Sequence, residues 1–201
     1  MKKIIPYLIV ILITSVNSYS QVIIGNSDGI YQTFNGYQCT VNSSVENPSK
    51  TGINTSNNVI QAITSLDQYE IAYANLDYYL NFNSVNSIAL KVFSNVAGEV
   101  MLKIAHQANL AVNKVVSCYY STPGFWQEIY FNFNCTSSDN NTYNQISILP
   151  DYENTTGSNN WYFDDIRTSS IPPFAEDTIV NFDNINRIFE NWYTNGISIV
   201  S

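Results

Sequence analysis

The chain has 201 residues, of which 12% are charged and 14% aromatic, and its 16 acidic residues against 8 basic ones give a formal net charge of −8 at pH 7. This charge repels phosphate backbones and anionic lipid, which argues against nucleic acid and membrane surfaces as partners. Few charges with many aromatic residues are typical of an all-β extracellular domain, and the length suffices for one sizeable core.

The first 20 residues predict a secretory signal peptide. Lys2 and Lys3 precede an apolar run over residues 4–13, and Ser18 and Ser20 place small residues at the spacing that signal peptidase recognises. The run is shorter than the roughly 18 residues needed to cross a bilayer, and we expect no membrane insertion. The mature chain should begin at Gln21 and be secreted or displayed at the cell surface.

Short strands separated by turns are predicted along the mature chain, with no run of helical periodicity. They cover residues 22–24, 37–45, 59–63, 76–82, 88–93, 100–104, 112–120, 126–133, 143–149 and 161–166. Hairpins are predicted between residues 87–94 and 99–105, and between residues 112–120 and 126–133, where Pro123 and Gly124 favour a turn. Many short strands with frequent turns predict a two-sheet antiparallel β-sandwich.

Cys39, Cys118 and Cys135 are an odd number of cysteines for a secreted chain. At most one internal disulfide can form, and the sequence does not decide which pair it joins. Buried free thiols are equally compatible with these positions.

The residue types argue against an enzyme. His106 is the only histidine, and its place just after an alternating strand favours a loop or edge position over a catalytic base. Asp164 and Asp165 are neighbours in a predicted strand, so alternation should send them to opposite faces, whereas glycoside hydrolysis needs two carboxyl groups flanking one bond. Spacings typical of metal-binding histidines and cysteines are absent, as are glycine-rich phosphate loops.

Two neighbouring aspartates in a half-buried strand need an explanation. If one of them is buried, its carboxylate needs a cation or several hydrogen-bond donors. Calcium, which takes about 6–8 oxygen ligands, is one solution in secreted β-sandwiches. The alternative is a strand end at which both aspartates are solvated or cap turns.

Several segments resemble the galactose-binding-like jelly rolls of the carbohydrate-binding module type, which occur in secreted and surface proteins of bacteria such as the Bacteroidetes. The resemblance covers residues 22–167 and is carried by residues 47–56, 88–93, 98–103, 124–133 and 162–166. It implies a jelly roll without catalysis, stabilised by calcium and binding glycan. It also implies that Asp164 is a calcium ligand, whereas the second acidic position of the family falls near Gly25, which has no carboxylate.

Sugar recognition needs aromatic rings on which pyranose faces stack, together with planar hydrogen-bonding groups. Outward positions of the predicted strands offer both, and they would form one mixed patch if their strands are neighbours. We predict the following carbohydrate-binding residues: Tyr79, Lys91, Phe93, Lys103, Glu128 and Tyr130. Packing is the alternative role for any aromatic residue in so aromatic a chain.

Two classes of function remain open. The first is a secreted, non-catalytic module that binds polysaccharide or cell-surface glycan, as part of a tandem or multidomain protein. The second is a structural or adhesive β-sandwich repeat that contacts protein or acts as a spacer and binds no sugar.

The end of the chain resembles its beginning. Residues 180–192 align without a gap on residues 22–34, with Trp192 on Phe34 and Ile188 on Ile30, which indicates an internal repeat. The alternative is that this tail is an integral strand of the one domain and that the similarity is a coincidence of β-rich composition. The predicted organisation is a signal peptide over residues 1–20, a jelly roll over 21–170, a linker over 171–177 and the truncated start of a second copy over 178–201.

Overall fold

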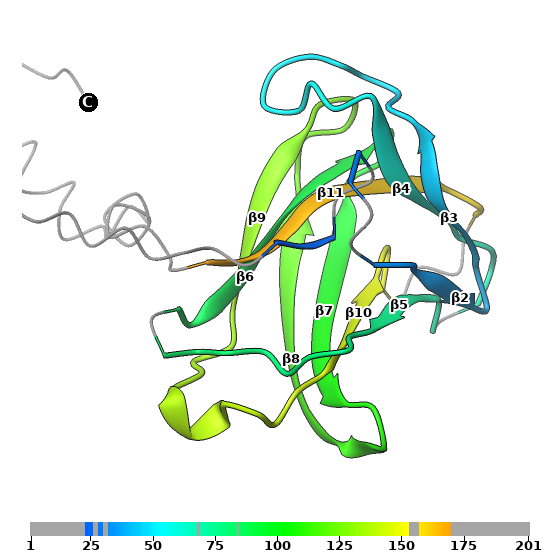
Figure 1. Cartoon of the computed structure of the whole chain (residues 1–201). Coiled ribbons are helices and arrows are strands. Elements are labelled where there is room, and N and C mark those ends of the chain that lie inside the picture. Colours follow the sequence, from blue (N-terminus) through cyan, green and yellow to red (C-terminus); the bar gives the residue numbers. More distant parts are fainter. Residues whose placement is uncertain are drawn as a thin grey trace, which may run out of the picture.

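The computed structural model describes residues 23–25, 28–29, 32–67, 69–83, 85–152 and 157–169, which form two antiparallel sheets packed face to face (Figure 1). The predicted signal peptide, linker and partial repeat lie outside these residues. Within them there is one short 3-10 helix, η1 (Ser137–Asp139), and no helix long and apolar enough to cross a membrane. The predicted all-β, two-sheet sandwich of jelly-roll type is confirmed.

One sheet has six strands: β1 (Ile23–Gly25), β3 (Thr40–Glu46), β4 (Asn58–Ile63), β6 (Ser87–Ser94), β9 (Gln127–Asn132) and β11 (Asn160–Ser169). Its order is β3-β4-β11-β6-β9, with β1 paired to β11. The other sheet has five strands: β2 (Asn35–Tyr37), β5 (Ile71–Asn75), β7 (Gly98–His106), β8 (Asn109–Tyr120) and β10 (Gln145–Leu149). Its order is β2-β5-β10-β7-β8. The chain crosses repeatedly between the sheets, as a jelly roll requires.

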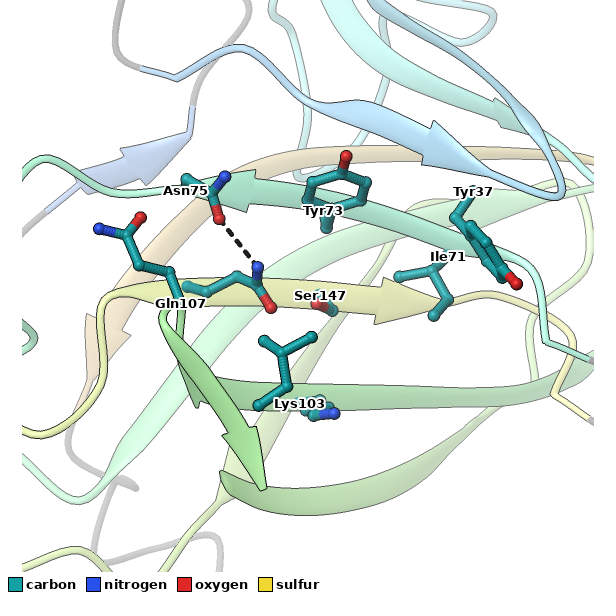
Figure 2. A pocket seen from close by; sticks show the side chains of 9 residues that line it. Tyr37, Ile71, Tyr73, Asn75, Lys103, Gln107 and Ser147 are labelled. Carbon is teal, nitrogen blue, oxygen red and sulfur yellow. Dashed lines mark hydrogen bonds between the residues drawn. The ribbon is translucent and has the colours of Figure 1, made fainter. Parts of the chain in front are cut away.

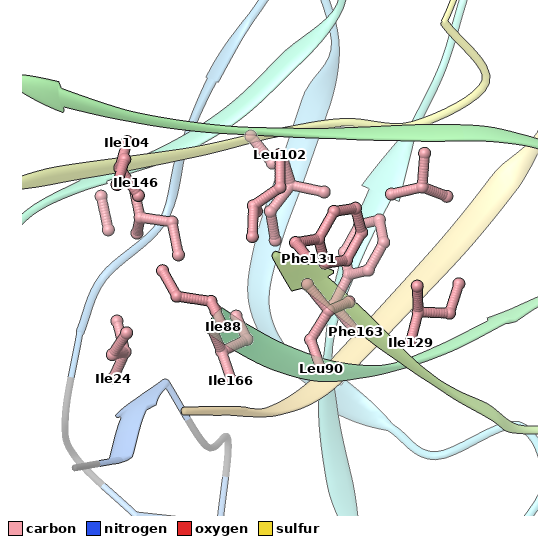
Figure 3. Close-up of a cluster of buried hydrophobic side chains, with 14 of the residues drawn as sticks. Ile24, Ile88, Leu90, Leu102, Ile104, Ile129, Phe131, Ile146, Phe163 and Ile166 are labelled. Carbon is pink, nitrogen blue, oxygen red and sulfur yellow. The ribbon is translucent and has the colours of Figure 1, made fainter. Parts of the chain in front are cut away.

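The hydrophobic core lies between the two sheets. Ile88 and Leu90 of β6 and Leu102 and Ile104 of β7 are fully buried. Figure 3 shows these side chains gathered with Phe131, Phe163 and Ile146 from neighbouring strands. Burying each such side chain contributes about 1.5–3 kcal/mol. The alternation predicted for these two strands therefore correctly identifies their core-facing side chains.

Both predicted hairpins are wrong. β6 pairs with β9 and β11, whereas β7 pairs with β8 and β10 in the opposite sheet. In the same way, β8 and β9 belong to different sheets. Gly124 does take the positive φ expected of its turn, at +81°. Turn residues indicate that the chain reverses, but they do not indicate whether it returns within one sheet or crosses to the other.

Residues 76–82 alternate in burial as predicted, yet they do not form a strand. Leu76, Leu80 and Phe82 are buried. The backbone of this segment makes separate hydrogen bonds, including Leu80 N to Tyr143 O at 2.8 Å, in place of a continuous ladder. Alternation thus reports which side chains are buried, and pairing with a neighbour decides whether the segment is a strand.

All three cysteines lie in the described part of the chain as free thiols. Cys39 and Cys118 are partly buried, and Cys135 is buried. Burial raises the pKa of Cys39 and that of Cys135 to about 11. At neutral pH these two thiols are therefore protonated and poor nucleophiles.

Candidate functional site

A groove of about 480 Å³ crosses the outer face of the five-stranded sheet (Figure 2). Strand alternation explains its lining, because Ala72 and Ala74 of β5 point into the core and leave Tyr73 and Asn75 on the outer face. Residues from β2, β5, β7, β8, β10 and the β7–β8 turn line the groove: Tyr37, Ile71, Tyr73, Asn75, Lys103, Gln107, Leu110, Gln145 and Ser147.

Several polar groups of this groove have no hydrogen-bond partner within the described residues. The Nε2 of Gln145 donates to the Oδ1 of Asn75 at 2.8 Å, as the dashed line in Figure 2 shows. This bond leaves the Oε1 of Gln145 and the Nδ2 of Asn75 available. The hydroxyls of Tyr37, Tyr73 and Ser147 are also unpartnered in this part of the chain. These donors and acceptors can serve a hydroxyl-rich ligand.

Tyr79 and His106 lie next to each other beside the β7–β8 turn. Tyr79 is 42% exposed, and its ring centroid is 6.0 Å from that of His106. His106 ends β7, and its Nδ1 accepts a hydrogen bond from the backbone of Ala108 at 3.2 Å. Gln107, which follows, lines the groove. His106 thus has a structural role in the turn, and Tyr79 lies close to one end of the groove.

The outer face of the six-stranded sheet carries an ion-pair cluster instead. Lys91 pairs with Asp165 at 2.5 Å, and Arg167 pairs with Glu128 at 2.6 Å. The hydroxyl of Tyr130 donates to Glu128. Burial alone would raise the pKa of Glu128, but hydrogen bonds from Tyr130 and Arg167, with the charges of Arg167 and Lys91, hold it below its usual value. The cluster satisfies its own charges.

This cluster lines a second, smaller groove of about 410 Å³, together with Ile23 of β1. Its two cations and two carboxylates face each other in pairs. A ligand that used any of these charges would first have to break an ion pair that is partly shielded from water.

An aromatic cluster on the same outer face is covered by residues 47–57. Phe93 is 6% exposed and packs against Trp126 and Tyr162, with ring centroids at 5.5 and 5.9 Å. The Nε1 of Trp126 donates to the carbonyl of Ser49 at 2.9 Å and to the Oδ1 of Asn47 at 3.2 Å. These bonds attach the covering segment, drawn in cyan in Figure 1, to the sheet.

Asp164 is fully buried, and neither carboxylate oxygen has a hydrogen-bond partner among the described residues. Burial raises its pKa, and the side chain of Ser56, the backbone of Asp165 and the side chain of Asn54 are close enough to offset this in part, although none of them has hydrogen-bond geometry with the carboxylate. The side-chain amide nitrogen of Asn54, which is also fully buried, likewise lacks a partner in the described chain. Asp164 is therefore buried next to Asn54 and Ser56 of the segment of residues 47–57, and no lysine or arginine of the described chain forms an ion pair with it.

The prediction that Asp164 and Asp165 face opposite sides of the sheet is wrong. The register of β11 against β6 shifts between Asp164 and Arg167, and Asp165 has a left-handed φ of +46°. Asp164 is the register partner of Lys91, and Lys91 is also the ion-pair partner of Asp165. A β-bulge inserts an extra residue and so interrupts the alternation, which places both carboxylates on the outer side.

The structure divides the six predicted sugar-binding residues into three groups. Lys91, Glu128 and Tyr130 come together, but in the ion-pair cluster. Phe93 faces outward and is buried, so its prediction as an exposed platform is wrong. Lys103 lines the groove of the other sheet, and Tyr79 is close to that groove. A single patch is impossible because β6 and β7 belong to different sheets.

Sequence reasoning missed the groove residues Tyr37, Tyr73, Asn75 and Gln145. The pattern that could have identified them lies in β5, where Ile71, Tyr73 and Asn75 alternate with two alanines. Small inward residues carry a weak apolar pattern, so residues 71–75 were not predicted as a strand, although their period of two is visible.

Comparison with solved structures identifies the fold as one that carbohydrate-binding modules share. The chain is similar to a family 29 carbohydrate-binding module, with a TM-score of 0.51 and 10% identity over 78% of this chain and 96% of that chain. It is also similar to a variant of such a module complexed with cellulohexaose (TM-score 0.51, 10% identity, 75% and 92% covered). A variant complexed with mannohexaose gives a TM-score of 0.51 and 10% identity, with 77% and 98% covered. No protein-family model matches the sequence, and no curated protein matches it either.

Proposed function

We propose that this chain is a secreted, non-catalytic glycan-binding module that holds a polysaccharide in the groove of the five-stranded sheet. The observation that carries the proposal is the groove itself, where Tyr37 and Tyr73 lie beside unpartnered amide and hydroxyl groups. The fold shared with modules complexed with cellulohexaose and mannohexaose supports it. The module would belong to the galactose-binding-like type, within a tandem or multidomain surface protein.

The chemistry of the groove suits a sugar chain. Pyranose rings present C–H faces that stack on tyrosine, and their hydroxyls both donate and accept hydrogen bonds. Asn75, Gln145 and Gln107 supply amides of both kinds along the groove. The described residues of the lining include no carboxylate, the group that glycoside hydrolysis uses in pairs. Binding without cleavage is therefore the function proposed for this surface.

Replacing Tyr73 or Tyr37 by alanine is expected to weaken polysaccharide binding. Each substitution removes one stacking surface, worth roughly 1–1.5 kcal/mol, which corresponds to about a tenfold loss of affinity. Affinity gel electrophoresis against soluble glucomannan, with calorimetric titration of a mannohexaose ligand, measures the loss. Thermal melting of each variant shows whether the fold is retained.

Two control variants locate the binding face. Phe125→Ala removes a 70% exposed ring outside the groove and should leave binding unchanged. Tyr130→Ala tests the prediction that Lys91, Glu128 and Tyr130 contact the sugar. If Tyr130→Ala abolishes binding while Tyr73→Ala does not, the ligand lies on the six-stranded sheet. If the wild type retains no glycan at all, the structural or adhesive role becomes the better account.

We also propose that calcium stabilises the module beneath residues 47–57. The unpartnered, fully buried carboxylate of Asp164 supports this proposal, since a buried carboxylate needs a compensating cation. Asp164 would hold the ion with side-chain oxygens of Asn54 or Ser56 and backbone carbonyls of the covering segment, an oxygen donor set that suits calcium. The metal would supply structural charge compensation and take no part in chemistry.

Without calcium, the wild type is expected to lose stability relative to Asp164→Asn as the pH rises. Burial raises the folded-state pKa of Asp164 above its usual value of 3.8, so the folded protein binds this proton more tightly than the unfolded chain does. The resulting stabilisation is complete below the unfolded pKa and is lost as the pH rises through the folded pKa. Urea unfolding of both proteins in chelator, from about pH 3.5 to about pH 7, measures the difference. A difference that does not change with pH would contradict the raised pKa.

A further inference from the structure

The charge of Lys103 is unusual among the described cations. Four of the five described lysine and arginine side chains have a carboxylate partner, in the pairs Lys50–Glu46, Lys91–Asp165, Lys114–Asp139 and Arg167–Glu128. Lys103 is the fifth, and no carboxylate of the described chain pairs with it. It is also the single charged residue among those that line the groove.

Among the described residues, the immediate neighbours of Lys103 on the sheet face carry no negative charge. Its register partners are Ser147 on β10 and Val115 on β8, and its neighbours on the same strand face are Met101 and Ala105. The next acidic residue along this face of β7 is Glu99. At about 3.3 Å per residue, Glu99 lies roughly 13 Å away along the strand. A partly buried ammonium without a counter-charge favours an anionic ligand.

From this we infer that the groove recognises an acidic polysaccharide, and that Lys103 binds the carboxylate of a hexuronate unit. The inference rests on the proposed function, because it specifies which glycan the groove takes. Tyr73, Ser147 and Lys103 lie in one row across neighbouring strands. The backbones of β5 and β7 are two interstrand spacings apart, about 10 Å. One sugar ring stacked on Tyr73, together with the long side chain of Lys103, spans this distance.

Screening at physiological ionic strength weakens the opposition of the protein's negative net charge to this contact. The Debye length there is about 8 Å, so a carboxylate at the distance of Glu99 is largely screened from a ligand at Lys103. A single ammonium without further basic residues matches one carboxylate, whereas densely sulfated chains need clustered cations. The groove residues around Lys103 supply neutral amides and hydroxyls, which suit the remaining hydroxyls of a uronate.

The test compares three soluble polysaccharides at about 0.15 M salt: polygalacturonate, neutral glucomannan and dextran sulfate. A charge-assisted hydrogen bond should make the wild type bind polygalacturonate about tenfold more tightly than glucomannan. Lys103→Gln should remove this preference, because it should lower the affinity for polygalacturonate about tenfold more than the affinity for glucomannan. Lys103→Arg keeps the charge and should retain the preference. Lys50→Gln, which removes the same charge from the segment of residues 47–57, is the matched control and should have no effect.

Three outcomes would overturn the inference. Equal losses of polygalacturonate and glucomannan affinity in Lys103→Gln would mean that Lys103 acts only as a hydrogen-bond donor. The proposed glycan-binding function of the groove would then still stand. Tighter binding of dextran sulfate than of polygalacturonate would assign the cation to a sulfate ester. If the wild type binds none of the three polysaccharides, the proposed function fails together with the inference. In the first two outcomes only the inference about Lys103 fails.

Discussion

Chelation of calcium is expected to lower the melting temperature of the protein by several degrees. An ion that binds only the folded state, at a hundredfold excess over its Kd, stabilises that state by about 2.7 kcal/mol. For a domain of this size that corresponds to roughly 5–10 °C. Asp164 is the expected anchor because its two carboxylate oxygens are buried and unpartnered within the described chain. Differential scanning calorimetry with added calcium and with chelator measures the shift.

Asp164→Asn separates a metal ligand from a merely buried acid. In calcium the variant should melt below the wild type, because it loses a charged ligand. In chelator near neutral pH it should melt above the wild type, because a neutral amide replaces a buried charge whose pKa burial raises. Equal responses of variant and wild type to calcium would remove the metal from Asp164. Asp165→Asn is a neighbouring control, since Asp165 pairs with Lys91 and is part of the ion-pair cluster.

Trp126→Ala is expected to lower the free energy of unfolding by about 3–5 kcal/mol, the usual cost of truncating a buried tryptophan. The ring is 8% exposed and packs on Phe93, and its Nε1 donates to Ser49 and Asn47. Trp126→Phe keeps an aromatic ring but removes the donor, so a smaller loss of about 1–3 kcal/mol is expected. Urea unfolding monitored by circular dichroism gives both values.

The same substitution connects the covering segment to the calcium site. Because Trp126 attaches residues 47–57 to the sheet above Asp164, Trp126→Ala should also reduce the gain in melting temperature on adding calcium. Phe125→Ala, one residue away and exposed, should change stability by no more than about 0.5 kcal/mol. A calcium response that is undiminished in Trp126→Ala would mean that the segment and the metal site are independent.

Residue patterns in the chain establish the fold class and most strand positions. Apolar side chains repeating every second residue, as at Ile88 and Leu90 or at Leu102 and Ile104, are buried between the sheets as the pattern indicates. The pattern is local, because a sheet buries one of every two neighbours whatever strand lies beside it. Composition likewise indicates an all-β domain before any pairing is known.

Strand pairing, and with it the place of the candidate site, is decided only in the tertiary structure. Ladders join segments far apart in the chain, such as β11 with β4 and β6, and no local pattern specifies such partners. The assignment of β6 and β7 to different sheets separates Lys91 from Lys103, and the covering segment buries Phe93. The bulge at Asp165, which brings both aspartates to one side of the sheet, also depends on the register between strands. Register and coverage are properties of the whole packed chain, so the groove and the buried carboxylate become visible only when the sheets are assembled.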